Sequence, residues 1–424
     1  MTRPPRLLQL VHAYPPALGG VQQSVSDVCE ALVADYGWEV TVLTTNALTS
    51  LSFRDSAIPT LPVEPYEQRN GVTVRRFPVD TRWAPFLRYA QAAAYRLRLP
   101  GHGKLRTLWT GPISPGLLRA TQTEKADVIC AATFPFNHLS YPFRRPEPRP
   151  PVILVGAIHT ENPWTYHRPD LFRLVKRAYS TIVHTEHERQ WLIEDQHVSP
   201  EQVRVIGHGI ETPKPHPPEG TFRHAHGVPP DAFIVAYVGA HARHKGIETL
   251  IQVFPRLVES HGTAWLVIAG AETEYSAQLQ RLISALPDQV RAHVLFFTDI
   301  SDSLKAEILV DCDVFASPSR EEAFGITTIE AWAYAKPVVV GDSPGQLDVV
   351  ENGRLGLVVP HRDEDRLLDA LVRLAKDEGL RGELARAGKD QVTARYDLSR
   401  VIDQYRTLFA EAAGSAAKVT ANRS

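Results

Sequence analysis

The sequence predicts an α/β protein made of two doubly wound domains, and three observations lead to this prediction. The chain has 424 residues, which is too long for one ordinary core and suits two domains of about 200 residues each. Short β-branched runs alternate along the chain with segments of helical periodicity. A proline-rich stretch, residues 211–231, separates two such series, and its six prolines in 21 residues favour a linker.

The predicted strands are apolar on both faces, and a helical pattern follows each of them. This combination is typical of parallel sheets that are covered on both sides. The strands are expected near residues 7–11, 39–45, 71–77, 126–132, 152–158, 180–185 and 203–207, and near residues 233–239, 264–270, 293–298, 313–318, 337–341 and 356–360. We therefore expect an N-terminal domain at 1–210 and a C-terminal domain at 232–397. Because open parallel sheets bind ligands at the carboxyl ends of their strands, two such sheets facing each other would form a ligand-binding cleft.

The composition is that of a soluble globular protein, with 43% hydrophobic and 22% charged residues. No apolar run approaches the roughly 18 to 20 residues of a membrane-spanning helix, and the N-terminus lacks the cleavage site of a secretory signal. Three widely spaced cysteines, Cys29, Cys130 and Cys312, match neither a disulfide framework nor a zinc site. We therefore expect a cytoplasmic protein.

The charge is unevenly distributed, at +5 for residues 1–210 and −7 for residues 211–424. Residues 81–120 contain no Asp or Glu, but they hold seven cations, among them Arg88, Arg96 and Arg98, and five aromatic residues. Such a stretch suits an anionic membrane surface, a phosphorylated acceptor or, with no other supporting feature, nucleic acid. A solvated face that packs its aromatic side chains inward explains it equally well. We expect the stretch to border an acceptor site, which allows a peripheral position at the inner membrane face.

Two loops that follow predicted strands have features of anion sites. Gly19-Gly20 closes the first loop just before a helix, where the backbone can come close to a ligand. A tight strand-to-helix turn would need the same glycines. The second loop runs from Gly239 to Gly246 and brings Arg243, Lys245 and two histidines to a helix N-terminus, which suits a phosphate. A solvated basic turn is the alternative there.

The most informative segment is residues 317–331, in which a strand ends and a helix opens at Phe324-Gly325-Ile326. The start of that helix can hold a phosphate. The carboxylates of Glu322 and Glu330, on either side of it, can accept hydrogen bonds from sugar hydroxyls. One site would then recognise a phosphate and a polyol together, unless the two residues are merely exposed acids.

Glu322 and Glu330, which bracket FGITTI, resemble the E-x7-E motif of retaining GT-B glycosyltransferases of the GT4 family, the group 1 glycosyl transferases. Gly19-Gly20-Val21 is similar to the glycine loop of that family, and Gly239 with Lys245-Gly246 matches part of its G-R…K-G segment. Four further segments follow the C-terminal order of the family, at residues 264–272, 293–300, 312–340 and 345–360.

The resemblance implies a GT-B fold whose last helix, from about residue 398 to 424, crosses back onto the first domain. It also implies metal-independent, retaining transfer of a sugar from a nucleotide diphosphate-sugar to an acceptor hydroxyl on a glycan, a lipid-linked molecule or a small metabolite. By the same resemblance Glu322 binds the donor sugar, Lys245 neutralises the leaving phosphate and His159 lies near the reaction centre. The implied donor-binding residues are Gly19, Gly20, Arg243, Lys245, Thr298 (backbone, base), Glu322, Phe324, Gly325, Ile326, Thr327 (backbone, diphosphate) and Glu330 (ribose).

The sequence departs from the family pattern at Ala240, where the family has an arginine. Arg243 and His244 are candidates to replace that cation. The donor base and sugar stay open, and so do two other functions. One is a nucleotide-sugar 2-epimerase, and the other is a catalytically retired GT-B module that binds a nucleotide sugar or a partner.

We expect no cofactor and no metal. Asp311-Cys312-Asp313 is a D-x-D, the pattern that carries the metal of GT-A glycosyltransferases, but here it precedes a predicted strand and is expected to be structural. His184 and His187 stand three residues apart at the start of a predicted helix, with no third ligand near in sequence.

Overall fold

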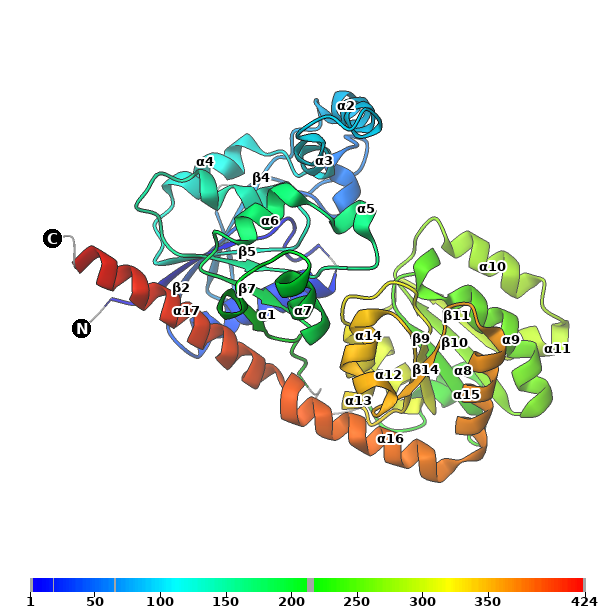
Figure 1. Cartoon of the computed structure of the whole chain (residues 1–424). Helices are drawn as coiled ribbons and strands as arrows, with labels where there is room; N and C mark the ends of the chain where they lie inside the picture. Colours follow the sequence, from blue (N-terminus) through cyan, green and yellow to red (C-terminus); the bar gives the residue numbers. More distant parts are fainter. Residues whose placement is uncertain (1–2, 18, 65, 212–216, 422–424) are drawn as a thin grey trace. The chain divides into compact units, whose positions relative to one another are not determined.

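The computed structural model describes residues 3–17, 19–64, 66–211 and 217–421, and it confirms the predicted fold class (Figure 1). The chain divides into two compact units. The first comprises residues 1–209 with 399–424, and the second comprises residues 210–398. Each unit is built on one sheet with helices on both of its faces. No helix in the described ranges has the length and apolar character needed to cross a membrane.

The sheet of the first unit has eight strands in the order β3-β4-β2-β1-β5-β6-β7-β8, and all neighbours are parallel except β3 and β4. The order reverses between β1 and β5, so this is the point at which such sheets bind ligands. The strands are β1 (Arg6–Leu10), β2 (Glu39–Thr45), β3 (Glu67–Arg69), β4 (Val72–Phe77), β5 (Val128–Ala132), β6 (Val152–Val155), β7 (Ser180–Val183) and β8 (Val203–Val205).

Strand β3 is absent from the sequence-based prediction, because its three polar residues lack a β-branched run. It pairs with β4 across Asn70 and Gly71, whose φ angles are 47° and 83°. An Asn-Gly pair with both φ angles positive is the signature of a two-residue hairpin turn. The signal was therefore present in the sequence, in the turn rather than in the strand.

The helices of the first unit bury both faces of its sheet. Leu8 and Leu10 of β1 belong to a buried cluster that also contains residues of the covering helices, such as Leu117, Leu171 and Leu192. The helices are α1 (Gly20–Ala34), α2 (Ala84–Arg96), α3 (His102–Thr110), α4 (Pro115–Thr123), α5 (Pro163–Tyr166), α6 (Pro169–Val175), α7 (Glu186–Glu194) and α17 (Leu398–Ala421). Although α17 is last in the sequence, its Phe409 is fully buried in this unit, with its ring centre 6.4 Å from that of Trp38.

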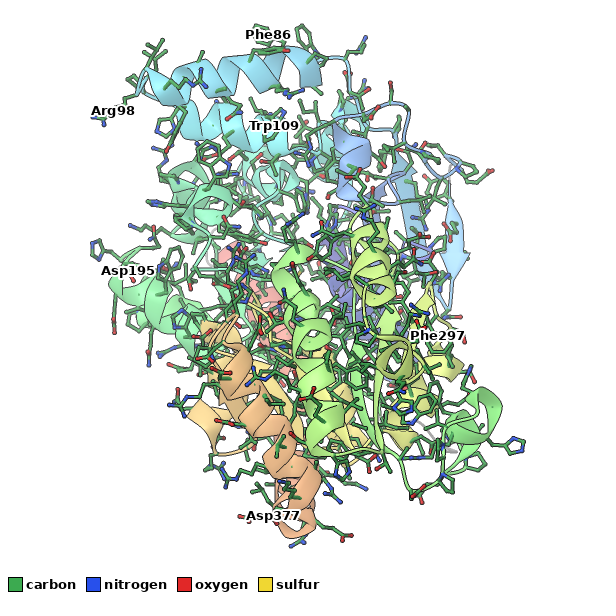
Figure 2. The ribbon with its side chains drawn as sticks, turned by 90° about the vertical axis from the view of Figure 1, so that its right-hand side faces the viewer. Phe86, Arg98, Trp109, Asp195, Phe297 and Asp377 are labelled. Carbon is green, nitrogen blue, oxygen red and sulfur yellow. The ribbon has the colours of Figure 1, made fainter. Side chains whose placement is uncertain are left out.

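Helices α2 and α3 lie in the long connection between β4 and β5 and pack against each other. Figure 2 shows Phe86 on the outer side of α2 and Arg98 just beyond its end, with Trp109 on α3. The inner side of α2 buries Leu87 and Ala94. The pair of helices thus has one packed side and one open side.

The sheet of the second unit has six parallel strands in the order β11-β10-β9-β12-β13-β14. Its order reverses between β9 and β12. The strands are β9 (Phe233–Val238), β10 (Ala264–Gly270), β11 (Val294–Thr298), β12 (Val314–Ser317), β13 (Val338–Gly341) and β14 (Leu357–Val359). The helices are α8 (Thr221–His226), α9 (Ile247–Ser260), α10 (Ser276–Ser284), α11 (Asp288–Arg291), α12 (Asp302–Asp311), α13 (Ile326–Ala333), α14 (Pro344–Val349), α15 (Glu364–Lys376) and α16 (Glu378–Gln391).

Alternation along β9 shows why its residues are apolar throughout. Ile234, Ala236 and Val238 join the core on one face of the sheet, while Phe233, Val235 and Tyr237 join the core on the other face. Successive side chains of a strand point to opposite faces, so a strand that is covered on both sides has no solvent-facing position.

The expectation of a linker over residues 211–231 is wrong for its second half. Residues 212–216 lie outside the described residues, but α8 occupies 221–226, and Asp311 accepts hydrogen bonds from the backbone N–H groups of Gly220 (2.6 Å) and Arg223 (3.1 Å). Four of the six prolines precede α8 and two follow it, so the helix itself contains none. Proline excludes only the residues beside it, and a helix of this length fits between.

Replacing Phe222 tests whether α8 is part of the core of the second unit. Phe222 is fully buried, with its ring centre 6.0 Å from that of Phe297. We expect Phe222→Ala to destabilise this unit by about 3–5 kcal/mol, the usual effect of removing a buried phenylalanine. Hydrogen exchange in urea, followed by mass spectrometry on β9 and β12 peptides, would measure the loss. His224→Ala, at an exposed position of the same helix, is the control, and equal exchange in both variants would contradict the assignment.

Candidate functional site

The loops after β9 and β12 flank the point where the strand order of the second sheet reverses, and they are held against each other. Gly246 has a φ of +74°, and a Cβ atom there would stand 2.1 Å from the carbonyl oxygen of Pro318. The backbone N–H of Arg320 donates to the carbonyl of His244 over 2.8 Å. Only glycine fits at position 246, and it allows the loop with Lys245 to approach the end of β12.

Lys245 and Glu322 meet at this edge of the sheet. The Lys245 ammonium donates a hydrogen bond to the Glu322 carboxylate, and the two side chains are 20% and 15% exposed. The loop that carries Glu322 is fixed from behind by Gly345 at the start of α14, where a Cβ atom would stand 2.4 Å from the Glu322 carbonyl oxygen. Burial, and then the charge of Glu322, raise the pKa of the Tyr237 hydroxyl well above its ordinary value. The pair is thus partly buried and held by backbone packing on two sides.

Glu330 lies in α13, the helix that follows Glu322, and has a lysine partner of its own. The Lys305 ammonium of α12 donates to the Glu330 carboxylate over 2.9 Å and lies 3.3 Å from Asp302. Burial acts to lower the pKa of Lys305, but the charges and hydrogen bonds of Glu330 and Asp302 outweigh it, so the pKa is raised. Lys305 was not predicted as a site residue, because a lysine on a helix gives no signal by itself.

The N-terminus of α13 carries two further polar groups that the sequence analysis missed. Gly325 precedes the helix with a φ of +91°, and the first N–H groups of a helix have no partner within it. The Gln346 amide nitrogen and the Thr328 hydroxyl are both buried, and neither has a hydrogen-bond partner among the described residues. They lie 3.5 Å and 3.2 Å from the place that a Gly325 Cβ would occupy. These two donors and the helix start together suit an anion.

The structure also places the remaining predicted residues of the second unit. The Arg243 guanidinium stacks over Tyr275 at 4.9 Å and donates to Gln278 over 3.0 Å, so it lies against α10. The carbonyl of Ala240 accepts from the Tyr237 hydroxyl. Phe324 is buried, and Thr298 is the exposed last residue of β11. Of the predicted donor residues, Lys245, Glu322 and the start of α13 form the most closely connected group.

In the first unit, the loop after β1 covers a buried aromatic cluster. The ring centre of His12 lies 4.5 Å from that of Phe136, and its Nε2 atom is 3.2 Å from the amide nitrogen of Gln22. Burial, with a contribution from His138, lowers the pKa of His12 to about 3, so the imidazole is neutral near pH 7. Gly19 has a φ of +151°, which favours glycine, and a Cβ atom there would crowd against the Gln22 side chain; α1 begins at Gly20.

His159 lies in the loop after β6, beside Glu161 and Tyr166. Its Nδ1 atom is 3.7 Å from a Glu161 carboxylate oxygen, and its ring centre is 4.9 Å from that of Tyr166. The base of this loop is tied to α7, because the buried carboxylate of Glu188 accepts from the backbone N–H of Ile158 at 2.6 Å. The same carboxylate accepts from the N–H groups of His184 and Thr185. Glu188 thus joins the ends of β6 and β7 beneath His159.

The two candidate metal patterns have other partners. Asp311 bonds the backbone of α8, and Asp313 accepts from the Ile234 N–H at 2.8 Å, so the D-x-D is structural as predicted. His187 pairs with the Thr160 hydroxyl at 2.8 Å, while the His184 ring turns inward. Across the described ranges no group of three or more His, Cys, Asp or Glu residues is placed to hold a metal ion.

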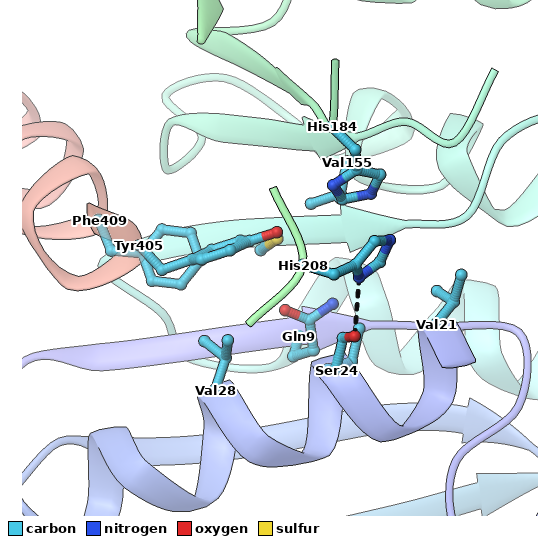
Figure 3. Close-up of a pocket in the computed structure, with 11 residues that line it drawn as sticks. Gln9, Val21, Ser24, Val28, Val155, His184, His208, Tyr405 and Phe409 are labelled. Atoms are coloured by element: carbon cyan, nitrogen blue, oxygen red, sulfur yellow. Dashed lines mark hydrogen bonds between the residues drawn. The ribbon is translucent and has the colours of Figure 1, made fainter. Parts of the chain in front are cut away.

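His184 stacks on His208 beside a small cavity under α1 and α17 (Figure 3). The ring centres are 4.0 Å apart, and the Nδ1 atom of His208 is 2.8 Å from the Ser24 hydroxyl. Burial, and then the proximity of His184, hold the pKa of His208 well below its ordinary value. The cavity measures about 20 Å³, which is room for a water molecule and not for a nucleotide.

Comparison with known proteins identifies the group to which this architecture belongs. The model of the family described as Glycosyltransferase Family 4 matches residues 18–214, and the model described as Glycosyl transferases group 1 matches residues 219–391. A phosphatidyl-myo-inositol mannosyltransferase of Mycobacterium leprae is 33% identical over 176 residues, 41% of this chain and 45% of that protein. A D-inositol 3-phosphate glycosyltransferase of Saccharomonospora viridis is 27% identical over 257 residues, 58% and 60% of the two chains. The chain spans about half the length of the curated relatives that it matches.

Solved structures agree with the fold. A sucrose-phosphate synthase of Thermosynechococcus elongatus has a TM-score of 0.71 at 21% identity, over 96% of this chain and all of that one. The HepE protein of Anabaena, solved with UDP and glucose, has a TM-score of 0.67 at 17% identity, over 96% and 99% of the two chains. At this identity the likeness concerns the fold alone. The two family models, one for each unit, confirm the resemblance drawn from the E-x7-E segment and place the chain in glycosyltransferase family 4, the group 1 glycosyl transferases.

Proposed function

We propose that this protein transfers a sugar from a nucleotide diphosphate-sugar to an acceptor hydroxyl, with retention of configuration and without a metal ion. The observation that carries the proposal is the grouping of Lys245, Glu322 and the start of α13 at the strand-order reversal of the second sheet. A lysine, a helix start and buried amide and hydroxyl donors suit a diphosphate, and a carboxylate beside them suits sugar hydroxyls. Structural relatives have been solved with UDP or a UDP-sugar bound.

Each residue then has a stated task. Glu322 would accept hydrogen bonds from the donor sugar, and Glu330 from the ribose. The N–H groups of Gly325 to Thr327, with those at Gly19-Gly20, would hold the diphosphate, and the backbone at Thr298 would contact the base. Lys245 would neutralise charge that develops on the leaving phosphate, the kind of electrostatic stabilisation that contributes most in such reactions. Gln346 and Thr328 would add two donors to the diphosphate.

We propose front-face attack, as the resemblance to glycosyltransferase family 4 implies. In that mechanism the acceptor hydroxyl approaches from the side of the leaving group, and an oxygen of the departing phosphate accepts its proton. His159 would contact the donor sugar near the reacting carbon, held by the loop that Glu188 fixes. The acceptor hydroxyl belongs to a glycan, a lipid-linked molecule or a small metabolite, and Arg88, Arg96 and Arg98 are the proposed acceptor-side cations.

A nucleotide-sugar screen tests this function. We expect one of UDP-, GDP-, ADP- or dTDP-sugars to raise the melting temperature. With a suitable hydroxyl acceptor, we expect that donor to yield an α-linked product from an α-linked sugar, at an unchanged rate in EDTA. Epimerised donor without any acceptor would assign the 2-epimerase instead. Donor binding with no turnover would assign a catalytically retired binding module. The motive for this alternative is Ala240, which stands where the family has an arginine.

A further inference from the structure

The open side of α2 and the turn after it form a surface that is both apolar and basic, which we call the α2 surface. Trp83, Phe86 and Tyr89 are 57%, 64% and 71% exposed, although an exposed helix face normally carries polar side chains. Leu97 and Leu99 continue the apolar character beyond the helix, at 69% and 47%. Large apolar side chains gathered in this way on an otherwise soluble unit indicate an interaction surface.

Three arginines, Arg88, Arg96 and Arg98, give the α2 surface its positive charge. Arg88, Arg96 and Arg98 are exposed, and none of them forms an ion pair with any described residue. Arg82 pairs with Asp80, the last acid before the acid-free segment 81–120. Figure 2 shows Phe86 and Arg98 toward opposite ends of α2. The positive charge is therefore available to an anionic partner.

The packed side of α2 and α3 is anchored to the rest of the first unit, so the α2 surface has a fixed position in that unit. The Arg106 guanidinium of α3 lies 3.7 Å from the Trp164 ring centre and 4.6 Å from that of Tyr95. Arg106 and Arg168 both donate to the Trp164 carbonyl, over 3.0 and 2.9 Å. Trp164 lies in α5, the short helix that follows His159 in the same loop. The α2 surface and the His159 loop are thus parts of one packed assembly.

We propose that the α2 surface docks on an anionic lipid bilayer. Trp and Tyr side chains prefer the interfacial region of a bilayer, exposed Phe and Leu can enter its acyl boundary, and neighbouring arginines are attracted to anionic headgroups. The absence of acids over residues 81–120 matches a surface of uniform negative charge, as charge complementarity requires. The partner is then a membrane, and its contact places the His159 loop on the membrane side of the first unit. This last consequence bears on lipid-linked acceptors only if the proposed function holds.

Vesicle co-sedimentation of the full chain tests the proposal. We expect the wild-type protein to sediment with vesicles of phosphatidylcholine and phosphatidylglycerol, and to stay in solution with phosphatidylcholine alone or at high salt. The triple variant Arg88→Glu, Arg96→Glu, Arg98→Glu is expected to lose at least about a hundredfold in affinity, since each basic residue near an anionic surface contributes roughly a fivefold factor and charge reversal adds repulsion. Phe86→Ser with Tyr89→Ser should also weaken binding, at unchanged charge.

A matched triple variant controls for net charge. Arg173→Glu, Lys176→Glu and Arg204→Glu make the same change at exposed sites elsewhere in the first unit and should bind vesicles like the wild type. Circular dichroism and the nucleotide-sugar melting shift on the same variants separate a loss of fold or donor binding from a loss of docking. No sedimentation of the wild type, or equal loss in both triple variants, overturns the proposal. Binding of a poly(dT) oligonucleotide that the first triple abolishes, without vesicle binding, assigns the surface to nucleic acid instead.

Discussion

Lys245→Ala and Glu322→Ala are each expected to reduce sugar transfer by about 10²–10³-fold, the range seen when one group that stabilises developing charge is removed. Under the proposed function Lys245 neutralises the leaving diphosphate and Glu322 binds the sugar, and the two side chains form an ion pair. Each substitution also leaves the other charge partly buried without its partner, so it perturbs the site beyond the loss of one contact. Initial rates at saturating donor, with donor affinity from calorimetry, separate an effect on kcat from an effect on binding.

Conservative variants at the two positions distinguish a loss of the site's chemistry from a loss of fold. Lys245→Arg keeps the charge and is expected to recover part of the rate, whereas Glu322→Gln keeps the shape and should retain binding better than Glu322→Ala. Lys376→Ala and Glu383→Ala, at exposed positions of the same unit, should leave transfer unchanged. Near-normal transfer in either Lys245→Ala or Glu322→Ala would remove this group from the mechanism.

Glu188→Ala is expected to destabilise the first unit by about 3–5 kcal/mol, because it leaves several buried donors without an acceptor. The carboxylate accepts from three backbone N–H groups and from the Thr185 hydroxyl, and it is 1% exposed. The loss should be seen first as faster hydrogen exchange at residues 156–161 and at the start of α7. Under the proposed function, transfer should fall as well, since the His159 loop loses its anchor.

Glu194→Ala is the matched control, since Glu194 ends the same helix and is exposed. Glu188→Gln, which keeps one acceptor oxygen, should lie between the wild type and Glu188→Ala. Unchanged exchange at residues 156–161 in Glu188→Ala would show that the loop is held by other contacts. A loss of transfer in Glu188→Gln at temperatures where it remains folded would instead separate positioning from stability.

The candidate site could be predicted from the sequence where its residues are close in sequence and carry charge. Glu322, Gly325 and Glu330 fall within one strand-to-helix segment, so their order alone places them around a helix start. Lys245 was predictable from its glycine loop. Gln346, Thr328 and Lys305 were not, because a neutral amide, a helical threonine and a surface lysine occur at many positions without function. Gln346 and Thr328 stand out only as buried donors without partners in the described ranges, and Lys305 only through its ion pair with Glu330. Both observations depend on how the chain packs.

The sequence by itself determined the two parallel sheets, through strands that are apolar on both faces, and it determined the family, through the segment around Glu322. Local periodicity and turn chemistry are properties of neighbouring residues, so they can be read along the chain. The tertiary structure decided what depends on residues far apart. It placed α8 in the second core through Phe222 and Asp311, and it put Glu188 beneath the loop of His159. It also turned Phe86 and Tyr89 of α2 outward, where the sequence left an inward packing equally open. These outcomes depend on contacts between residues that are far apart in the sequence. Such contacts produce no periodic pattern along the chain, so the sequence alone does not predict them.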